Sequence, residues 1–86
     1  MNLYQLRYFS VLAGTQHYGK AAEKLCIAQP SLSHAISQLE QELGVQLFER
    51  KGRSSSLTSA GEQFLTYVNK SLAILDNGIS AMEHIS

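Results

Sequence analysis

The chain has 86 residues, enough for one small domain, and no apolar run approaches the ~18 residues of a membrane span. Hydrophobic residues make up 44% and charged residues 16%, a composition that excludes a disordered tail. Lys and Arg balance Asp and Glu at seven each, which argues against nucleic-acid binding by bulk charge alone, although six of the seven basic residues lie within residues 1–53. The first residues lack the layout of a signal peptide, so we expect a cytoplasmic protein.

The first two predicted elements are short helices. Over residues 3–13, apolar side chains recur at helical spacing on one stripe, at Leu6, Phe9 and Ala13. Gly14 is the predicted end of this helix. A second helix is expected over about 19–26, with small alanines on its inner face that let another helix approach closely. Cys26, the single cysteine, is predicted to be a small core hydrophobe, with redox sensing as the alternative.

The strongest helical stripe follows Pro30, a residue that suits the first turn of a helix. It consists of Leu32, Ile36, Leu39 and Leu43. Gly44 is the predicted stop. Because the turn before this helix is so short, the pair of helices indicates a helix-turn-helix.

The next segment, residues 45–57, has apolar ends and a polar, basic tip with the sequence ERKGRSSS. This pattern predicts a β-hairpin with short strands, or wing. After it, Thr58 and Ser59 offer N-cap hydroxyls, and Ser59 with Glu62 matches a capping box.

The last helix is expected from residue 59 to the end of the chain, with Asn77-Gly78 as a weak point. Its apolar residues follow a heptad pattern: Leu65, Val68, Leu72, Leu75, Ile79 and Met82. This seam is either internal core or a dimer surface. Because it extends beyond a 58-residue head, we expect its far end to need a partner, and a second copy is the simplest one.

The outward face of the helix after Pro30 is polar and has no charge between residues 29 and 39. It presents Ser31, Ser33, His34, Ser37, Gln38 and Gln41. An ordinary solvated face would use Lys and Glu, so the alternative, contact with base edges in a major groove, gains weight. The hairpin tip also has two interpretations. Its basic side chains are either solvent-exposed in a loop or lie along a phosphate backbone: Arg50, Lys51 and Arg53.

Catalytic, metal and cofactor sites are not expected. The three histidines lie in three different predicted elements, and one cysteine offers no CxxC pair. Ser33 and His34 are adjacent on a helix, so their side chains diverge and cannot form a nucleophile–base pair. No glycine-rich phosphate loop is present.

The segments LYQLRYFSVLA, AAEKL, AQPSLSHAISQLEQELGVQLFER and GRSSSLTSAGEQFL together resemble the LysR-type transcriptional regulators over nearly the whole chain. The resemblance implies a mostly α fold: a three-helix winged helix-turn-helix head with a short hairpin wing over residues 1–58, then a linker and dimerisation helix over 59–86. The helix-turn-helix proper would cover about 18–37. In that family a ligand-binding domain follows the linker, so a small-molecule effector is expected only for a form that has such a domain.

The resemblance also assigns residues. The recognition-helix surface would comprise Gln29, Pro30, Ser31, Ser33, His34, Ser37 and Gln38, and the wing would contact DNA backbone through Arg50, Lys51 and Arg53. Three positions depart from the family pattern: His34 is commonly Arg, Ala28 is usually a serine, and Ser37 is often basic. These departures lower the expected non-specific affinity.

We therefore expect a sequence-specific regulator that binds double-stranded DNA as a homodimer. A full-length form could also assemble as a tetramer. We expect no membrane contact and a bacterial, nucleoid-associated location. The alternative is a winged-helix adaptor that binds other proteins. The neutral net charge and the uncharged recognition helix favour that alternative slightly.

Overall fold

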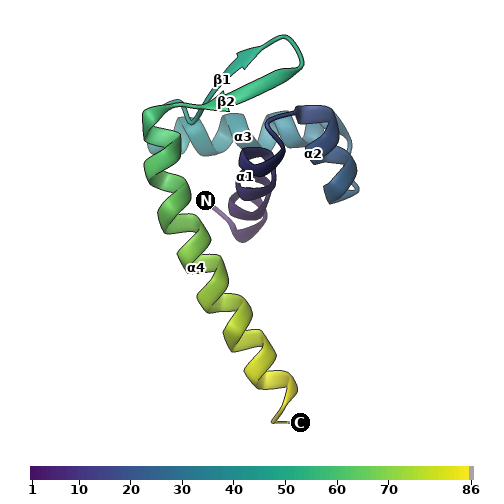
Figure 1. Cartoon of the computed structure of the whole chain (residues 1–86), viewed down its shortest axis with the longest axis vertical. Coiled ribbons are helices and arrows are strands. Elements are labelled where there is room, and N and C mark those ends of the chain that lie inside the picture. Colours follow the sequence, from purple (N-terminus) through teal and green to yellow (C-terminus); the bar gives the residue numbers. More distant parts are fainter. Residues whose placement is uncertain (86) are drawn as a thin grey trace.

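The computed structural model describes residues 1–85, and within them the chain forms four helices and one two-stranded antiparallel hairpin. In chain order these are α1 (Leu3–Thr15), α2 (Tyr18–Leu25), α3 (Gln29–Leu43), β1 (Phe48–Lys51), β2 (Ser54–Leu57) and α4 (Ser59–Glu83). Figure 1 shows α1, α2 and α3 gathered into a head, the hairpin along one side of it, and α4 running away from it. The predicted mostly α winged architecture is confirmed.

The core lies where α1, α2 and α3 meet. The apolar stripes predicted for α1 and α3 supply most of its large, fully buried side chains: Phe9, Leu12, Leu32, Ile36 and Leu39. Ala21 and Ala22 are buried on α2, where their small side chains allow close packing of the three helices. Hydrophobic periodicity alone therefore located the centre of the head.

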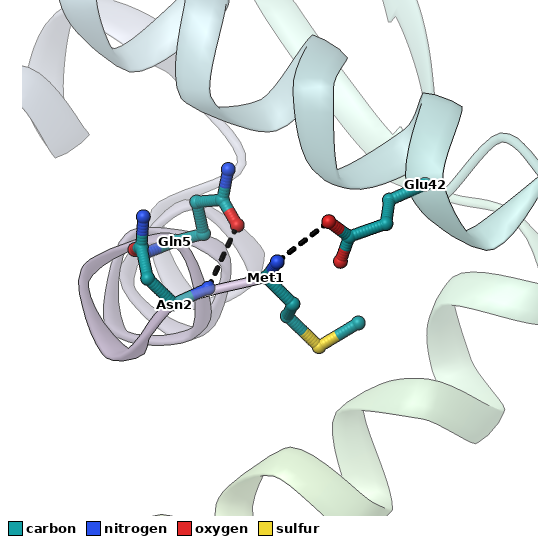
Figure 2. A network of polar contacts seen from close by, with 4 residues as sticks. All are labelled: Met1, Asn2, Gln5 and Glu42. Carbon is teal, nitrogen blue, oxygen red and sulfur yellow. Dashed lines mark hydrogen bonds and ion pairs between the residues drawn. The ribbon is translucent and has the colours of Figure 1, made fainter.

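The start of α1 is held by polar contacts that the sequence analysis did not predict. Asn2 caps the helix, because its side chain accepts a hydrogen bond from the Gln5 N–H while the Gln5 side chain accepts one from the Asn2 N–H. Figure 2 shows this pair beside the ion pair between the Met1 ammonium and Glu42, which lies near the end of α3. The ion pair ties the beginning of α1 to the far end of α3.

Two helix ends differ from the predictions because residues other than glycine adopt the left-handed conformation there. Gly14 does not end α1; the helix continues to Thr15, and Gln16 forms the C-cap with φ 56°. Cys26 caps α2 with φ 57° and is exposed, so its predicted place in the core was wrong. Ile27, which is partly buried, packs against the core instead, and its N–H bonds to the Ala22 carbonyl.

The N-terminal half of α4 completes the core. The Phe64 ring packs on Phe9 with centroids 5.5 Å apart, and Val68 and Leu72 are buried. Thr58, rather than Ser59, is the N-cap, since its Oγ1 accepts a hydrogen bond from the Gly61 N–H at 3.0 Å. The helix continues through Gly78 to Glu83, so the predicted weak point does not interrupt it.

None of the helices within residues 1–85 is long and apolar enough to cross a membrane.

Candidate nucleic-acid interface

The outward face of α3 is open to solvent. Ser33 is half-buried, and the other six residues assigned to this face are exposed: Gln29, Pro30, Ser31, His34, Ser37 and Gln38. Neither the hairpin nor α4 covers this face. The buried Leu32, Ile36 and Leu39 lie on the opposite side of the same helix, so burial of the apolar stripe orients the polar face outward.

The side chains of this face are also free to bond. Within residues 1–85, none of the seven residues assigned to the recognition surface donates or accepts a side-chain hydrogen bond, and none is charged. Hydroxyl, amide and imidazole groups offer both donors and acceptors, which is what contact with base edges in a major groove requires. Ala28, the N-cap of α3, provides no side-chain cap, and Pro30 lies in the first turn.

The wing extends from the head beside α2. Its register pairs Phe48 with Leu57 and Lys51 with Ser54, and Gly52 turns the tip with φ 61°. Lys51 and Arg53 are exposed at this tip. The wing is joined to the head at the segment between α1 and α2, where the Ser55 N–H donates to the Gln16 carbonyl at 3.0 Å and His17 bridges to Ser54.

Arg50 does not project with the tip. It lies on the face of β1 that is turned toward the head, and its guanidinium carbon Cζ lies over the Tyr18 ring, 4.4 Å from the centroid. Burial raises the pKa of the Tyr18 hydroxyl, and Glu40 raises it further, while Arg50 opposes the shift. The phenol therefore stays neutral at physiological pH, and its ring remains a good partner for a cation.

A carboxylate that the sequence analysis passed over anchors the start of the wing. Oε2 of Glu40, on α3, accepts hydrogen bonds from the N–H groups of Leu47 at 2.7 Å and Phe48 at 3.2 Å. These bonds fix the beginning of the hairpin to α3. The sequence offers little to distinguish Glu40 from an ordinary solvent-exposed glutamate, because its only local feature is that it follows Leu39 of the apolar stripe.

The heptad seam of α4 divides into two parts. Val68 and Leu72 are buried in the chain's own core and Leu65 packs against it, whereas Leu75, Ile79 and Met82 are exposed. Two further apolar side chains, Tyr67 and Ile74, are exposed on α4 and were not predicted, and Ile85 is exposed just beyond its end. The seven-residue spacing of Tyr67 and Ile74 was the signal that could have found them.

In the part of the chain that the structure describes, no group of three or more His, Cys, Asp and Glu side chains is placed to hold a metal ion. A tightly joined helix pair followed by a hairpin wing defines the class of winged helix-turn-helix proteins. The family model for bacterial regulatory helix-turn-helix proteins of the lysR family matches residues 3–62. The chain belongs to this LysR family.

Known relatives agree in sequence and in fold. The transcriptional regulator BenM of Acinetobacter baylyi is 45% identical over 86 residues, which cover 100% of this chain and 28% of BenM. The crystal structure of the BenM DNA-binding domain with benA site 1 DNA superimposes with a TM-score of 0.91 at 45% identity, covering 100% of both chains. The CbnR DNA-binding domain in complex with DNA gives a TM-score of 0.91 at 32% identity, covering 99% of this chain and 98% of that one.

Proposed function

We propose that this domain binds double-stranded DNA sequence-specifically as the head of a transcription regulator of bacterial cytoplasm. The outward face of α3 lies in the major groove, and Lys51, Arg53 and Arg50 of the wing bind flanking phosphates. The observation that carries the proposal is the exposed, uncharged and unpaired face of α3. The proposal is supported by the two similar crystal structures described above, because both are complexes with DNA.

We further propose that two copies act together through the exposed part of the α4 seam. Two heads related by a two-fold axis require an inverted-repeat site with half-sites about one helical turn, or a small multiple, apart. Three or four phosphate contacts per head give about six to eight per dimer, so the slope of log K against log salt is about −5 to −7.

Selection of binding sites from random duplexes with the purified domain tests these points together. We expect an inverted-repeat motif, and on the selected duplex a fluorescence-anisotropy salt titration with the slope given above. A slope near zero, or no enriched motif, would contradict the proposal.

Two sets of variants separate base contacts from phosphate contacts. His34→Ala should relax discrimination at one base position by about 1–3 kcal/mol while leaving the salt slope unchanged. Charge reversal of Arg50 and Arg53 to Glu should weaken binding to every duplex, whereas Lys70→Glu, on the exposed side of α4, should not. Unchanged DNA retention after the wing reversal would favour the protein-binding adaptor.

A further inference from the structure

Tyr18 and Arg50 come from different elements and meet at the junction between the wing and α2. We propose that Tyr18 is a positioning residue for DNA binding: its ring holds the Arg50 guanidinium so that the edge of that group meets a backbone phosphate. The inference rests on the proposed function, because it assumes that the wing binds DNA.

Tyr18 is fixed by the head. It is the first residue of α2, only 7% exposed, and belongs to the core cluster. His17 immediately before it caps the helix, since its Nδ1 accepts a hydrogen bond from the Lys20 N–H at 3.0 Å. The ring therefore has a defined place at the start of the helix-turn-helix.

Arg50 is brought to this ring by strand geometry. Phe48 and Arg50 are two residues apart on β1 and share its inward face, and Phe48 is buried. Across the hairpin, Arg50 pairs with Ser55, which is 2% exposed and whose N–H bonds to the Gln16 carbonyl. Because Gln16 is two residues before Tyr18, this bond attaches β2 close to the ring, and β2 in turn holds the paired strand that carries Arg50.

The stacking leaves the hydrogen-bonding edge of Arg50 available. The guanidinium carbon Cζ lies over the ring, and Nε donates to the Gly52 carbonyl at 3.4 Å. Among the described residues, Nη1 and Nη2 of Arg50 have no hydrogen-bond partner. Planar arginine donors match a phosphate in bidentate fashion. A guanidinium already held in one orientation also loses less side-chain entropy on binding.

Charge alone does not give this arrangement. Arg53 and Lys51 are also basic and exposed, but within residues 1–85 neither lies over a ring. Lysine would lack the planar face needed for the stack. Arg50 is therefore the wing cation whose side-chain orientation is set by another residue. This difference between Arg50 and the other two basic residues can be measured.

A double-mutant cycle on the selected duplex tests the inference. We expect Tyr18→Phe, which keeps the ring, to preserve affinity, and Tyr18→Leu to weaken binding by about two- to tenfold on specific and non-specific duplexes alike. In an Arg50→Ala background, Tyr18→Leu should cause no further loss. Equal losses with and without Arg50 would overturn the inference, because Tyr18 would then act through the fold.

Conservative arginine variants provide the matched comparison, which is needed if Tyr18→Leu does not fold. Arg50→Lys keeps the charge but loses the planar stack and should weaken binding severalfold, whereas Arg53→Lys should change it less. NMR gives a direct readout, since the ring should shift the side-chain protons of Arg50 upfield in the wild type. Equal effects of the two Lys substitutions, or no ring-current shift, would refute the positioning role.

The two proposals can fail separately. If the wild-type domain selects no duplex, the proposed function fails. If it selects one, and Arg53→Ala weakens binding while Arg50→Ala does not, the function stands and the role of Tyr18 is refuted.

Discussion

The guanidinium of Arg7 on α1 binds the carboxylate of Asp76 on α4 in a two-pronged contact, with Nη2 2.9 Å from Oδ1 and Nη1 3.5 Å from Oδ2. Seven residues earlier on α4, the Ser10 hydroxyl donates to Asn69 Oδ1 at 2.8 Å. These are the polar ties between α1 and α4 among residues 1–85. They lie beside the buried Leu72, where α4 leaves the head.

The Arg7–Asp76 pair predicts a specific dependence of stability on pH. The hydrogen bond from Arg7 holds the pKa of Asp76 below its usual value. A carboxyl whose pKa is lower in the folded state stabilises the fold above the unfolded pKa, about 3.9 for Asp, and that contribution is lost as pH falls through the folded value. We expect the difference in unfolding midpoint between wild type and Asp76→Asn to be constant near neutral pH and to vanish in strong acid.

Urea unfolding from pH 7 down to pH 2.5 would measure this difference. Glu49→Gln is the control, because Glu49 is exposed and makes no ion pair within residues 1–85. A gap between wild type and Asp76→Asn that stays the same at the lowest pH would show that the ion pair is not its source.

Glu40 is predicted to be essential for the attachment of the wing. Replacing it with Ala removes the acceptor for the N–H groups of Leu47 and Phe48, and bonds to a charged group contribute about 1.5–3 kcal/mol. We expect Glu40→Ala to lower the free energy of unfolding by about that amount. Gln41→Ala, at the neighbouring exposed position, should have little effect. Equal stability of the two variants would exclude this anchoring role.

Two glycines in α4 should respond in opposite directions to the same substitution. At Gly61 an added Cβ would overlap the Leu47 carbonyl oxygen, so Gly61→Ala should move α4 away from the segment that leads into β1 and cost about 1–3 kcal/mol. At Gly78 an added Cβ meets nothing within 4 Å, and alanine favours a helix interior by about 1 kcal/mol. Thermal unfolding should therefore show a lower Tm for the first variant and a higher Tm for the second. The same direction of change at both sites would contradict the close packing at Gly61.

The helices of this fold were predictable because the apolar residues of each one recur at helical spacing and so form a single stripe that must be buried. The stripe from Leu32 to Leu43 placed α3, and the basic tip around Gly52 placed the turn of the hairpin. The polar face of α3 was predictable for the same reason: once Leu32, Ile36 and Leu39 face inward, the intervening residues must face outward.

What sequence reasoning missed depends on contacts between segments far apart in the chain. The left-handed caps at Gln16 and Cys26 lack the glycine that signals such a conformation. The bonds of Glu40 to the wing and the stacking of Arg50 on Tyr18 have no local pattern at all. Heptad spacing alone does not mark the residue at which the seam leaves the head; only the length of the seam indicated that its far end is uncovered, as Ile79 is, whereas Val68 and Leu72 are buried.

Ser55 is a buried position where a smaller side chain should stabilise the fold. Its hydroxyl has no hydrogen-bond partner in the described part of the chain, and an unsatisfied buried polar group costs about 1–3 kcal/mol. Ser55→Ala removes that group and leaves the backbone bond to Gln16 intact. We expect a higher Tm, with Ser56→Ala, at the exposed neighbouring position, close to wild type. A clear loss of stability in Ser55→Ala would show that the hydroxyl is bonded.

The exposed end of the α4 seam should determine oligomeric state. Leu75, Ile79 and Met82 continue the spacing of the buried residues but have no cover within residues 1–85. A lysine at the centre of an apolar helix interface must lose its hydration without a partner, so Ile79→Lys should shift the domain toward monomer. Asn77→Lys adds the same charge on the opposite side of α4 and should leave the association unchanged. Sedimentation velocity across a concentration series measures both variants. A wild-type domain that remains monomeric at the highest concentration would refute association through this surface.

Because a dimer engages two half-sites at once, we expect Ile79→Lys to weaken binding to an inverted repeat much more than binding to a single half-site.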